Sequence, residues 1–190
     1  MADRQELPPI EFVSIGEDTN CAGLKCTNTE INRWFEKSAL KEHLSGSLRV
    51  ICAVEQGISH RPLGFYAIAS VAEETANLPG LYHRFRKAEH FSALQLVWLA
   101  TDKGFVDRGL GALMVGEVTR MFASVGPLVA MPHLIVIPHK QDHERLVKFY
   151  GDLGFKRYKD GEAMFLSVQA AVDGEAKIQA ALAAMRAPEL

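Results

Sequence analysis

Hydrophobic positions along the chain follow two spacings, one typical of strands and the other typical of helices. Short apolar or alternating runs predict five strands, at residues 10–15, 48–54, 63–71, 93–101 and 133–138. Apolar positions three and four residues apart predict helices at residues 27–46, 110–125 and 142–153. A closing hairpin is expected at 155–158 and 163–168, followed by an alanine-rich helix at 169–187.

The order of these elements predicts the class of fold. Strands alternate with helices through the middle of the chain, which is typical of a mixed α/β sheet flanked by helices. The strand at 93–101 is almost continuously apolar, and this predicts burial on both of its faces. We expect residues 1–168 to form one domain and residues 169–190 to form a helical extension.

Composition and charge narrow the class of protein. The chain has 190 residues, of which 48% are hydrophobic and 23% are charged, and this suits a folded domain and excludes a disordered chain. Its 21 Lys and Arg against 23 Asp and Glu give a net charge of −2, so any surface for nucleic acid has to be a local basic patch. No apolar run approaches the roughly 20 residues that span a bilayer, so no membrane association is expected.

Cysteine and histidine spacings bear on compartment and on metal binding. Three cysteines, Cys21, Cys26 and Cys52, with no secretion signal before them predict reduced thiols in a cytoplasmic protein. Cys21 and Cys26 lack a second pair of ligands, and Pro138 places His139 in a loop outside the helix that carries His143. We therefore expect no metal site.

The segment after the strand at 93–101 contains the strongest candidate for a binding site. Gly109 and Gly111 lie directly before a helix, where glycines let the backbone approach a ligand and several N–H groups point outward. No Gly-Lys-Ser/Thr follows, as a Walker loop would require, and Met114 stands where a GxGxxG motif needs its third glycine. Two interpretations follow from these residues: a pyrophosphate site, or a tight strand-to-helix turn.

Two motifs in order resemble the GNAT superfamily of N-acetyltransferases. Residues 106–111 (VDRGLG) resemble the family's Gln/Arg-x-x-Gly-x-Gly/Ala loop, with Val106 in place of Gln or Arg. Residues 150–155 (YGDLGF) resemble its Tyr-x-x-x-Gly-Phe motif, and His143 stands where the family commonly has Asn. The resemblance implies a mixed six- or seven-stranded sheet and acetyl-CoA as acetyl donor.

The N-terminal half narrows the resemblance to the GNAT toxins of bacterial toxin–antitoxin pairs. Three segments carry it: residues 24–35 with the helix around Trp34, residues 64–70 (GFYAIAS), and residues 98–102 (WLATD). The resemblance covers roughly residues 10–168. It implies aminoacyl-tRNA as acceptor and an antitoxin protein as partner, and we expect a homodimer.

The resemblance also implies roles for individual residues. Leu99 and Thr101 would offer backbone groups to pantetheine, His143 would lie beside it, and Tyr150 would be the general acid that protonates the leaving thiolate. Tyr150 could instead simply pack its helix under the sheet. The diphosphate would be held by Val106, Asp107, Arg108, Gly109, Leu110, Gly111 and Ala112.

The acceptor is less well defined by the residues. No carboxylate presents itself as a general base, which favours an α-amino acceptor, because its pKa of about 7.7–8.0 lets it lose a proton far more easily than a lysine amine near 10.4. Arg84, Arg86 and Lys87 alternate with aromatic residues and are candidate RNA contacts, or they belong to a solvated loop. The alternatives are a GNAT enzyme for a small amine or a protein N-terminus, and a non-catalytic module that binds CoA.

Overall fold

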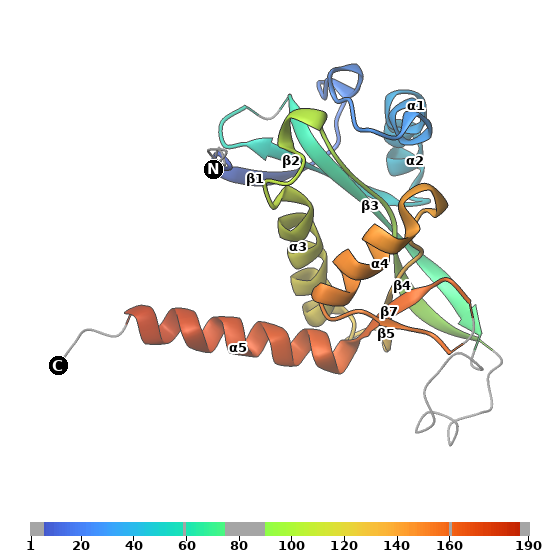
Figure 1. Cartoon of the computed structure of the whole chain (residues 1–190), viewed down its shortest axis with the longest axis vertical. Helices are drawn as coiled ribbons and strands as arrows, with labels where there is room; N and C mark the ends of the chain where they lie inside the picture. Colours follow the sequence, from blue (N-terminus) through green and yellow to red (C-terminus); the bar gives the residue numbers. More distant parts are fainter. Residues whose placement is uncertain (1–5, 59, 75–89, 160, 187–190) are drawn as a thin grey trace. The chain divides into compact units, whose positions relative to one another are not determined.

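The computed structural model describes residues 6–58, 60–74, 90–159 and 161–186, and the side chains up to residue 180 (Figure 1). Seven strands form one sheet in the order β1-β2-β3-β4-β5-β7-β6. This confirms the predicted mixed α/β sheet and gives it seven strands. The strands are β1 (Ile10–Ser14), β2 (Arg49–Glu55), β3 (Pro62–Glu74), β4 (His90–Thr101), β5 (His133–Val136), β6 (Lys156–Arg157) and β7 (Met164–Ser167). The α-helices are α1 (Thr29–Lys37), α2 (Ala39–Ser45), α3 (Leu110–Val125), α4 (His143–Asp152) and α5 (Val168–Arg186).

The chain divides into two compact units. The first comprises Met1–Ala69 with Leu96–Gly116, and the second comprises Ser70–Gln95 with Glu117–Leu190. The division into a domain at 1–168 and an extension at 169–190 stays a prediction.

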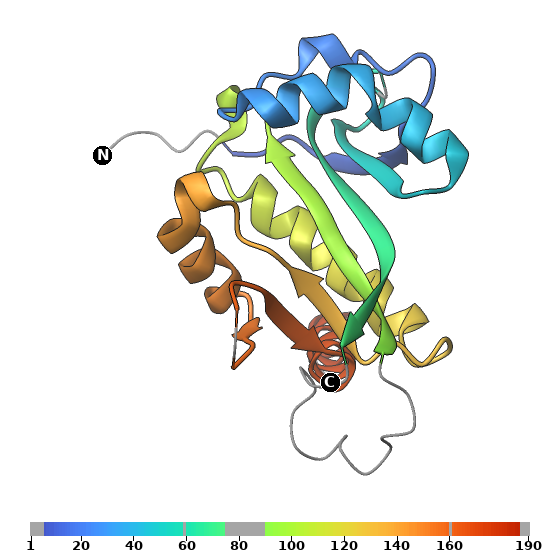
Figure 2. The same ribbon diagram turned by 90° about the vertical axis from the view of Figure 1, so that its right-hand side faces the viewer.

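The first helical segment forms two helices where the sequence pattern predicts one. Asn28 caps α1 by accepting hydrogen bonds from the amides of Glu30 and Ile31. Ser38, with φ −123° and ψ −31°, separates α1 from α2. The amide of Ser38 still donates to the carbonyl of Trp34 at 2.8 Å, so the two helices continue nearly end to end (Figure 2).

The break leaves the buried face of these helices in register. Ile31, Phe35, Ala39 and His43 are buried at a spacing of four residues through both helices. Leu44 lies outside this row and is 69% exposed. The four-residue row places Leu44 just beyond His43, whose ring takes the last core position of the segment.

The sheet of the first unit packs closely at Gly64 in β3. A Cβ atom at this position would meet the carbonyl oxygen of Ala100 at 2.8 Å and the side chain of Met114 at 3.0 Å. Since β3, β4 and α3 all approach this point, only glycine fits there without a shift of backbone. β2 pairs antiparallel with both β1 and β3.

The predicted amphipathic helix at 110–125 is present as α3. Leu110, Met114, Val118 and Phe122 are at most 1% exposed, whereas Leu113 is 43% exposed. Burial of residues 93–101 on both faces of the strand was expected, and the structure confirms it in part. Ala93 is buried on one face and Leu96 and Ala100 are buried on the other, while the remaining residues of this run are partly buried.

In the second unit, aromatic rings surround a buried histidine of β5. β7 pairs antiparallel with β5 and with β6, which confirms the closing hairpin. His133 is completely buried, and its Nδ1 atom lies 2.8 Å from the hydroxyl of Tyr158. The His133 ring lies 4.4 Å from the Phe165 ring and meets the Phe91 ring edge-on. The alanine-rich helix is present as α5.

Candidate functional site

The loop between β4 and α3 begins with a residue that holds several segments together. The side chain of Asp102 accepts hydrogen bonds from the amides of Gly104 and Lys25, both at 2.9 Å. The Asp102 amide donates to the carbonyl of Leu63 at 2.8 Å, and the Lys103 amide donates to the carbonyl of Lys25 at 2.9 Å. The start of the loop is therefore fixed to β3 and to the segment that precedes α1.

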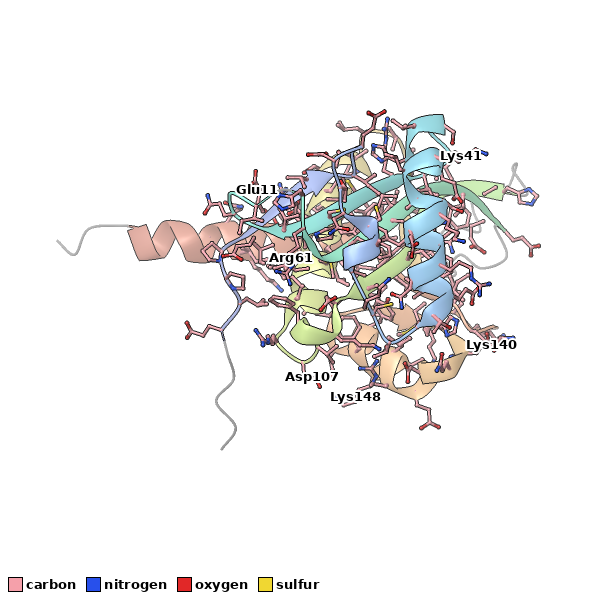
Figure 3. All side chains as sticks on the ribbon, turned by 90° about the horizontal axis from the view of Figure 1, so that it is seen from above. Glu11, Lys41, Arg61, Asp107, Lys140 and Lys148 are labelled. Atoms are coloured by element: carbon pink, nitrogen blue, oxygen red, sulfur yellow. The ribbon has the colours of Figure 1, made fainter. Side chains whose placement is uncertain are left out.

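The loop then turns sharply into α3. Asp107 has φ +60° and Gly109 has φ +88°, so two of three consecutive residues lie in the left-handed region. This region is strained for a side chain such as that of Asp107 and easily adopted by glycine. Arg108 lies between them with its guanidinium 5.0 Å from the centre of the Phe105 ring. Figure 3 shows Asp107 at the outer side of this turn.

The amides at the start of α3 are available to a ligand. The first helical bond runs from the Leu113 amide to the Gly109 carbonyl at 3.0 Å. The amides of Gly109, Leu110, Gly111 and Ala112 donate to none of the residues that the structure describes. Outward N–H groups at a helix N-terminus, strengthened by the helix dipole, favour an anion such as a diphosphate.

The side chains of the loop shape the charge around these amides. Gly109 is exposed, and a Cβ atom there would meet nothing within 4 Å, so a ligand can reach the backbone. Asp107 is exposed and opposes an anion, while the Arg108 guanidinium attracts one. Val106 is 37% exposed and contributes no polar group from its side chain.

The strand before this loop presents the two positions predicted to contact pantetheine. Leu99 and Thr101 are both partly buried near the end of β4. The neighbouring Trp98 ring lies 5.5 Å from the Trp34 ring of α1. Trp34 in turn donates its indole N–H to a carboxylate oxygen of Glu42 at 3.0 Å, which fixes the orientation of that ring.

Tyr150 lies near the end of α4 in the second unit. It is 6% exposed, and its ring contacts those of Phe149 and Phe155 edge-on. Burial raises the pKa of the Tyr150 hydroxyl well above its ordinary value near 10. The hydroxyl is therefore protonated at neutral pH, as a proton donor must be, and it is a weaker acid than an exposed tyrosine.

The Tyr-x-x-x-Gly-Phe motif is explained by the end of this helix. Gly154 has φ +92°, which reverses the chain directly after α4. The amide of Phe155 then donates to the carbonyl of Tyr150 at 3.0 Å. The two aromatic residues and the glycine thus form one turn that holds Tyr150 in place.

The predicted site residues fall in both units. Leu99, Thr101 and residues 106–112 all belong to the first unit, whereas His143 and Tyr150 belong to α4 in the second. His143 is the first residue of α4 and is partly buried. The candidate RNA contacts Arg84, Arg86 and Lys87 lie outside the described residues.

The sequence pattern did not reveal two positioning residues: Asp102, which fixes the start of the loop, and Asn32, which binds the backbone of Cys26 before α1. Asp102 was noted only within the WLATD segment, although an acidic residue directly after a strand is a common cap for the turn that follows. Asn32 accepts a hydrogen bond from the amide of Cys26 at 2.8 Å and donates one to the carbonyl of Cys26 at 3.0 Å. Nothing in the spacing of Asn32 and Cys26 indicates this pairing.

Two further observations concern metals and membranes. Among the described residues, no three His, Cys, Asp or Glu side chains gather closely enough to hold a metal ion. Within the same ranges, every helix is too short or too polar to cross a membrane.

Comparison with known proteins establishes the fold. No protein-family model matches the sequence. The chain is similar to a tyrosine-to-phenylalanine mutant of KacT, with a TM-score of 0.78 and 20% identity over 87% of this chain and 98% of that one. It is similar to AtaT complexed with acetyl-methionyl-tRNAfMet, with a TM-score of 0.75 and 19% identity over 89% of this chain and 99% of that one.

A third solved structure, the KacTA–DNA complex, matches with a TM-score of 0.74 and 20% identity over 88% of this chain and 99% of the other. Likeness at these identities concerns the path of the chain. It confirms the predicted GNAT-like fold of the toxin type.

Proposed function

We propose that the protein is an N-acetyltransferase that uses acetyl-CoA as its acetyl donor. The observation that carries this proposal is the set of available amides at Gly109 to Ala112, in the segment whose sequence resembles the diphosphate loop of GNAT enzymes. A structure of AtaTR bound with AcCoA, similar to this chain at a TM-score of 0.72, supports the choice of donor.

The donor would be held mainly by backbone groups. Acetyl-CoA carries a diphosphate that suits the amides of residues 109–112, and the Arg108 guanidinium would offset the charge of Asp107. The end of β4 around Leu99 would present its backbone to pantetheine, and one amide there would polarise the thioester carbonyl. Because backbone amides would hold the diphosphate, no polar side chain is needed at position 106, and this agrees with the valine there.

Tyr150 would complete the reaction by protonating the leaving thiolate. The amine of the acceptor attacks the thioester carbonyl, the C–S bond breaks, and the CoA thiolate takes the phenolic proton. The proton lost by the amine passes to solvent and returns to the tyrosine. The raised pKa of Tyr150 keeps it protonated between turnovers over a wide pH range.

The acceptor that we propose is the α-amino group of an aminoacyl-tRNA. AtaT, similar in fold, is known in complex with acetyl-methionyl-tRNAfMet, the product of such a reaction. An aminoacyl ester needs little base catalysis, because its amine is largely neutral near pH 8.

We further propose an antitoxin protein as a partner, and a homodimer as the state of the enzyme. The AtaT toxin has been solved bound to the C-terminus of the antitoxin AtaR, which supports the first of these. Expression of the chain should then arrest growth of a bacterial host, and co-expression of its antitoxin should restore growth.

The experiment that tests the enzymatic proposal has two stages. Calorimetric titration should show acetyl-CoA binding to the wild-type chain, and Gly111→Asp should weaken it about tenfold or more, because a carboxylate would face the diphosphate. Radiolabelled acetyl groups should then pass to a charged tRNA and not to the same tRNA without its amino acid. Absence of acetyl-CoA binding would end the proposal.

A different acceptor is distinguished at the second stage. Transfer to spermidine or to a peptide N-terminus, with no transfer to charged tRNA, would show an acetyltransferase of another substrate class. Binding of acetyl-CoA with no transfer to any of these amines would favour a non-catalytic module that binds CoA. Val106 and His143, which differ from the usual residues of the GNAT motifs, are the sequence features that motivate this alternative.

A further inference from the structure

One face of the α1–α2 segment carries a row of basic side chains. Arg33, Lys37 and Lys41 follow one another at intervals of four residues, and all three are exposed. Successive members of such a row lie about 6 Å apart along a helix. Figure 3 shows Lys41 on the outer side of the segment.

The row lies opposite the buried face of the same helices. The buried positions 31, 35, 39 and 43 also repeat every four residues, and they keep this spacing across the break at Ser38. A residue two positions further along a helix points roughly 200° away. The basic row therefore faces solvent along both helices.

Ion pairing distinguishes this row from cations on other helices. Arg33, Lys37 and Lys41 form no ion pair with any residue in the described ranges. Cations on other helices do: Arg120 pairs with Glu117 at 2.6 Å and Lys148 pairs with Asp152 at 2.7 Å. These three cations form a basic row beside the carboxylates of the same segment, Glu30, Glu36 and Glu42, on a chain whose net charge is −2.

The α1–α2 segment is firmly connected to the proposed donor site. Trp34 of α1 contacts Trp98, which directly precedes Leu99 in β4. The residues just before α1 are tied to the loop, since the Lys25 amide donates to Asp102. A ligand that rests on the basic row would thus be held by an element fixed to the strand that presents the thioester.

We infer that Arg33, Lys37 and Lys41 bind consecutive phosphates of the RNA acceptor, an inference that rests on the proposed function. Exposed lysines and arginines in a row bind a phosphodiester chain through its charge, whatever its sequence. The chain as a whole carries a net negative charge, and this row provides the local cations that binding of RNA requires. The backbone of RNA carries a negative charge at every phosphate, at regular intervals, whereas an acidic protein segment carries its charges on flexible carboxylate side chains. A regular row of cations therefore suits RNA better than an acidic protein.

The test compares two triple variants of equal charge. R33Q/K37Q/K41Q removes the row, and K156Q/R157Q/K159Q removes three exposed cations from the second unit as a matched control. Binding of a fluorescent methionyl-tRNA is measured by anisotropy between about 50 and 300 mM salt, where phosphate contacts dominate the salt dependence. Thermal unfolding confirms that both variants are folded, and calorimetry measures acetyl-CoA binding in parallel.

The row variant should lose about 10- to 100-fold in affinity for tRNA, and its slope of log affinity against log salt should fall by about 2. The control should stay within about twofold of wild type, and acetyl-CoA affinity and acetylation of methionine methyl ester should be unchanged in both. Equal tRNA affinity in the two variants would overturn the inference. So would a row variant that keeps tRNA and loses only a polyglutamate probe.

Failure of the proposed function has a different signature. A wild-type chain that binds acetyl-CoA and no tRNA overturns both the inference and the tRNA acceptor, and leaves the acetyltransferase standing. A wild-type chain that binds tRNA through the row but not acetyl-CoA supports the inference and removes the enzymatic proposal.

Discussion

Asp102 and Lys25, far apart in sequence, are joined by a hydrogen bond, and a second bond between Lys25 and the residue after Asp102 runs in the opposite direction. The carboxylate of Asp102 accepts the Lys25 amide at 2.9 Å, and the amide of the next residue, Lys103, donates to the Lys25 carbonyl at 2.9 Å. The chain before α1 and the chain after β4 are thereby held side by side. The position of the diphosphate loop depends on this pairing.

Replacing Asp102 by alanine should therefore loosen the loop. The variant loses the acceptors for the amides of Lys25 and Gly104, and the expected cost is about 2 kcal/mol in the free energy of unfolding, since the site is partly exposed. Chemical denaturation measures this cost, and calorimetry should show weaker acetyl-CoA binding. Glu17→Ala, which removes an exposed carboxylate from the same unit, should change neither quantity.

Gly109 and Gly116 provide a matched pair for the backbone of the loop. Gly109→Ala forces a Cβ atom into a backbone with φ +88°, and this should cost about 1 kcal/mol of stability and reduce acetyl-CoA affinity. Gly116 lies inside α3 with open space around it, so Gly116→Ala should stabilise the protein by about 0.5–1 kcal/mol. The two thermal midpoints should move in opposite directions; a shift of the same sign in both would contradict the assigned geometry.

Tyr150→Phe separates binding from chemistry. Removal of the hydroxyl should lower the rate of acetyl transfer by about 100-fold or more, as is typical of a lost general acid, and leave acetyl-CoA affinity unchanged. Steady-state kinetics and calorimetry on the same preparation measure the two effects. Phe149→Leu, a change in the partly buried neighbour, serves as the packing control.

The raised pKa of Tyr150 also sets the alkaline side of the pH profile. An exposed tyrosine loses its proton near pH 10, and an acid with a raised pKa keeps it beyond that point. The rate of acetyl transfer by wild type should not decline between about pH 8 and pH 10 through ionisation of this group. A decline centred near pH 9 that disappears in Tyr150→Phe would contradict the burial of the hydroxyl.

His133 should make the stability of the fold depend on acid. Burial lowers its pKa from 6.5 to about 4, so the unfolded chain binds the proton more readily than the folded chain does. Stability is therefore full above pH 6.5 and is lost as the pH falls towards 4. The expected loss between pH 7 and pH 5 is about 2 kcal/mol, measured by urea unfolding.

Two substitutions check this assignment. His133→Gln should flatten that pH dependence, although the variant itself will be less stable because the contact with the Tyr158 hydroxyl changes. His60→Gln, a change in an exposed histidine, should keep the wild-type dependence. An unchanged slope in His133→Gln would assign the acid sensitivity to other groups.

Local patterns were sufficient to predict most elements and the loop. The apolar spacing of α3 and the glycines at 109 and 154 could be interpreted from the sequence, because helical periodicity and a turn with positive φ depend on residues that are close together in the chain. The cap of α1 is equally local, since the side chain of Asn28 accepts from amides two and three residues away. The break at Ser38 was not predicted, because hydrogen bonds and the buried row continue through it.

Properties that depend on distant segments could not be obtained in this way. The pairing of Asp102 with Lys25, the crowding that requires glycine at 64, and the incomplete cover of β4 each arise where segments far apart in sequence meet. The identity of the amino acids limits which local conformations the backbone adopts at low energy. Long-range packing determines which side chains are buried, which amides stay available and which charges lack a partner. Binding and catalysis depend on these features.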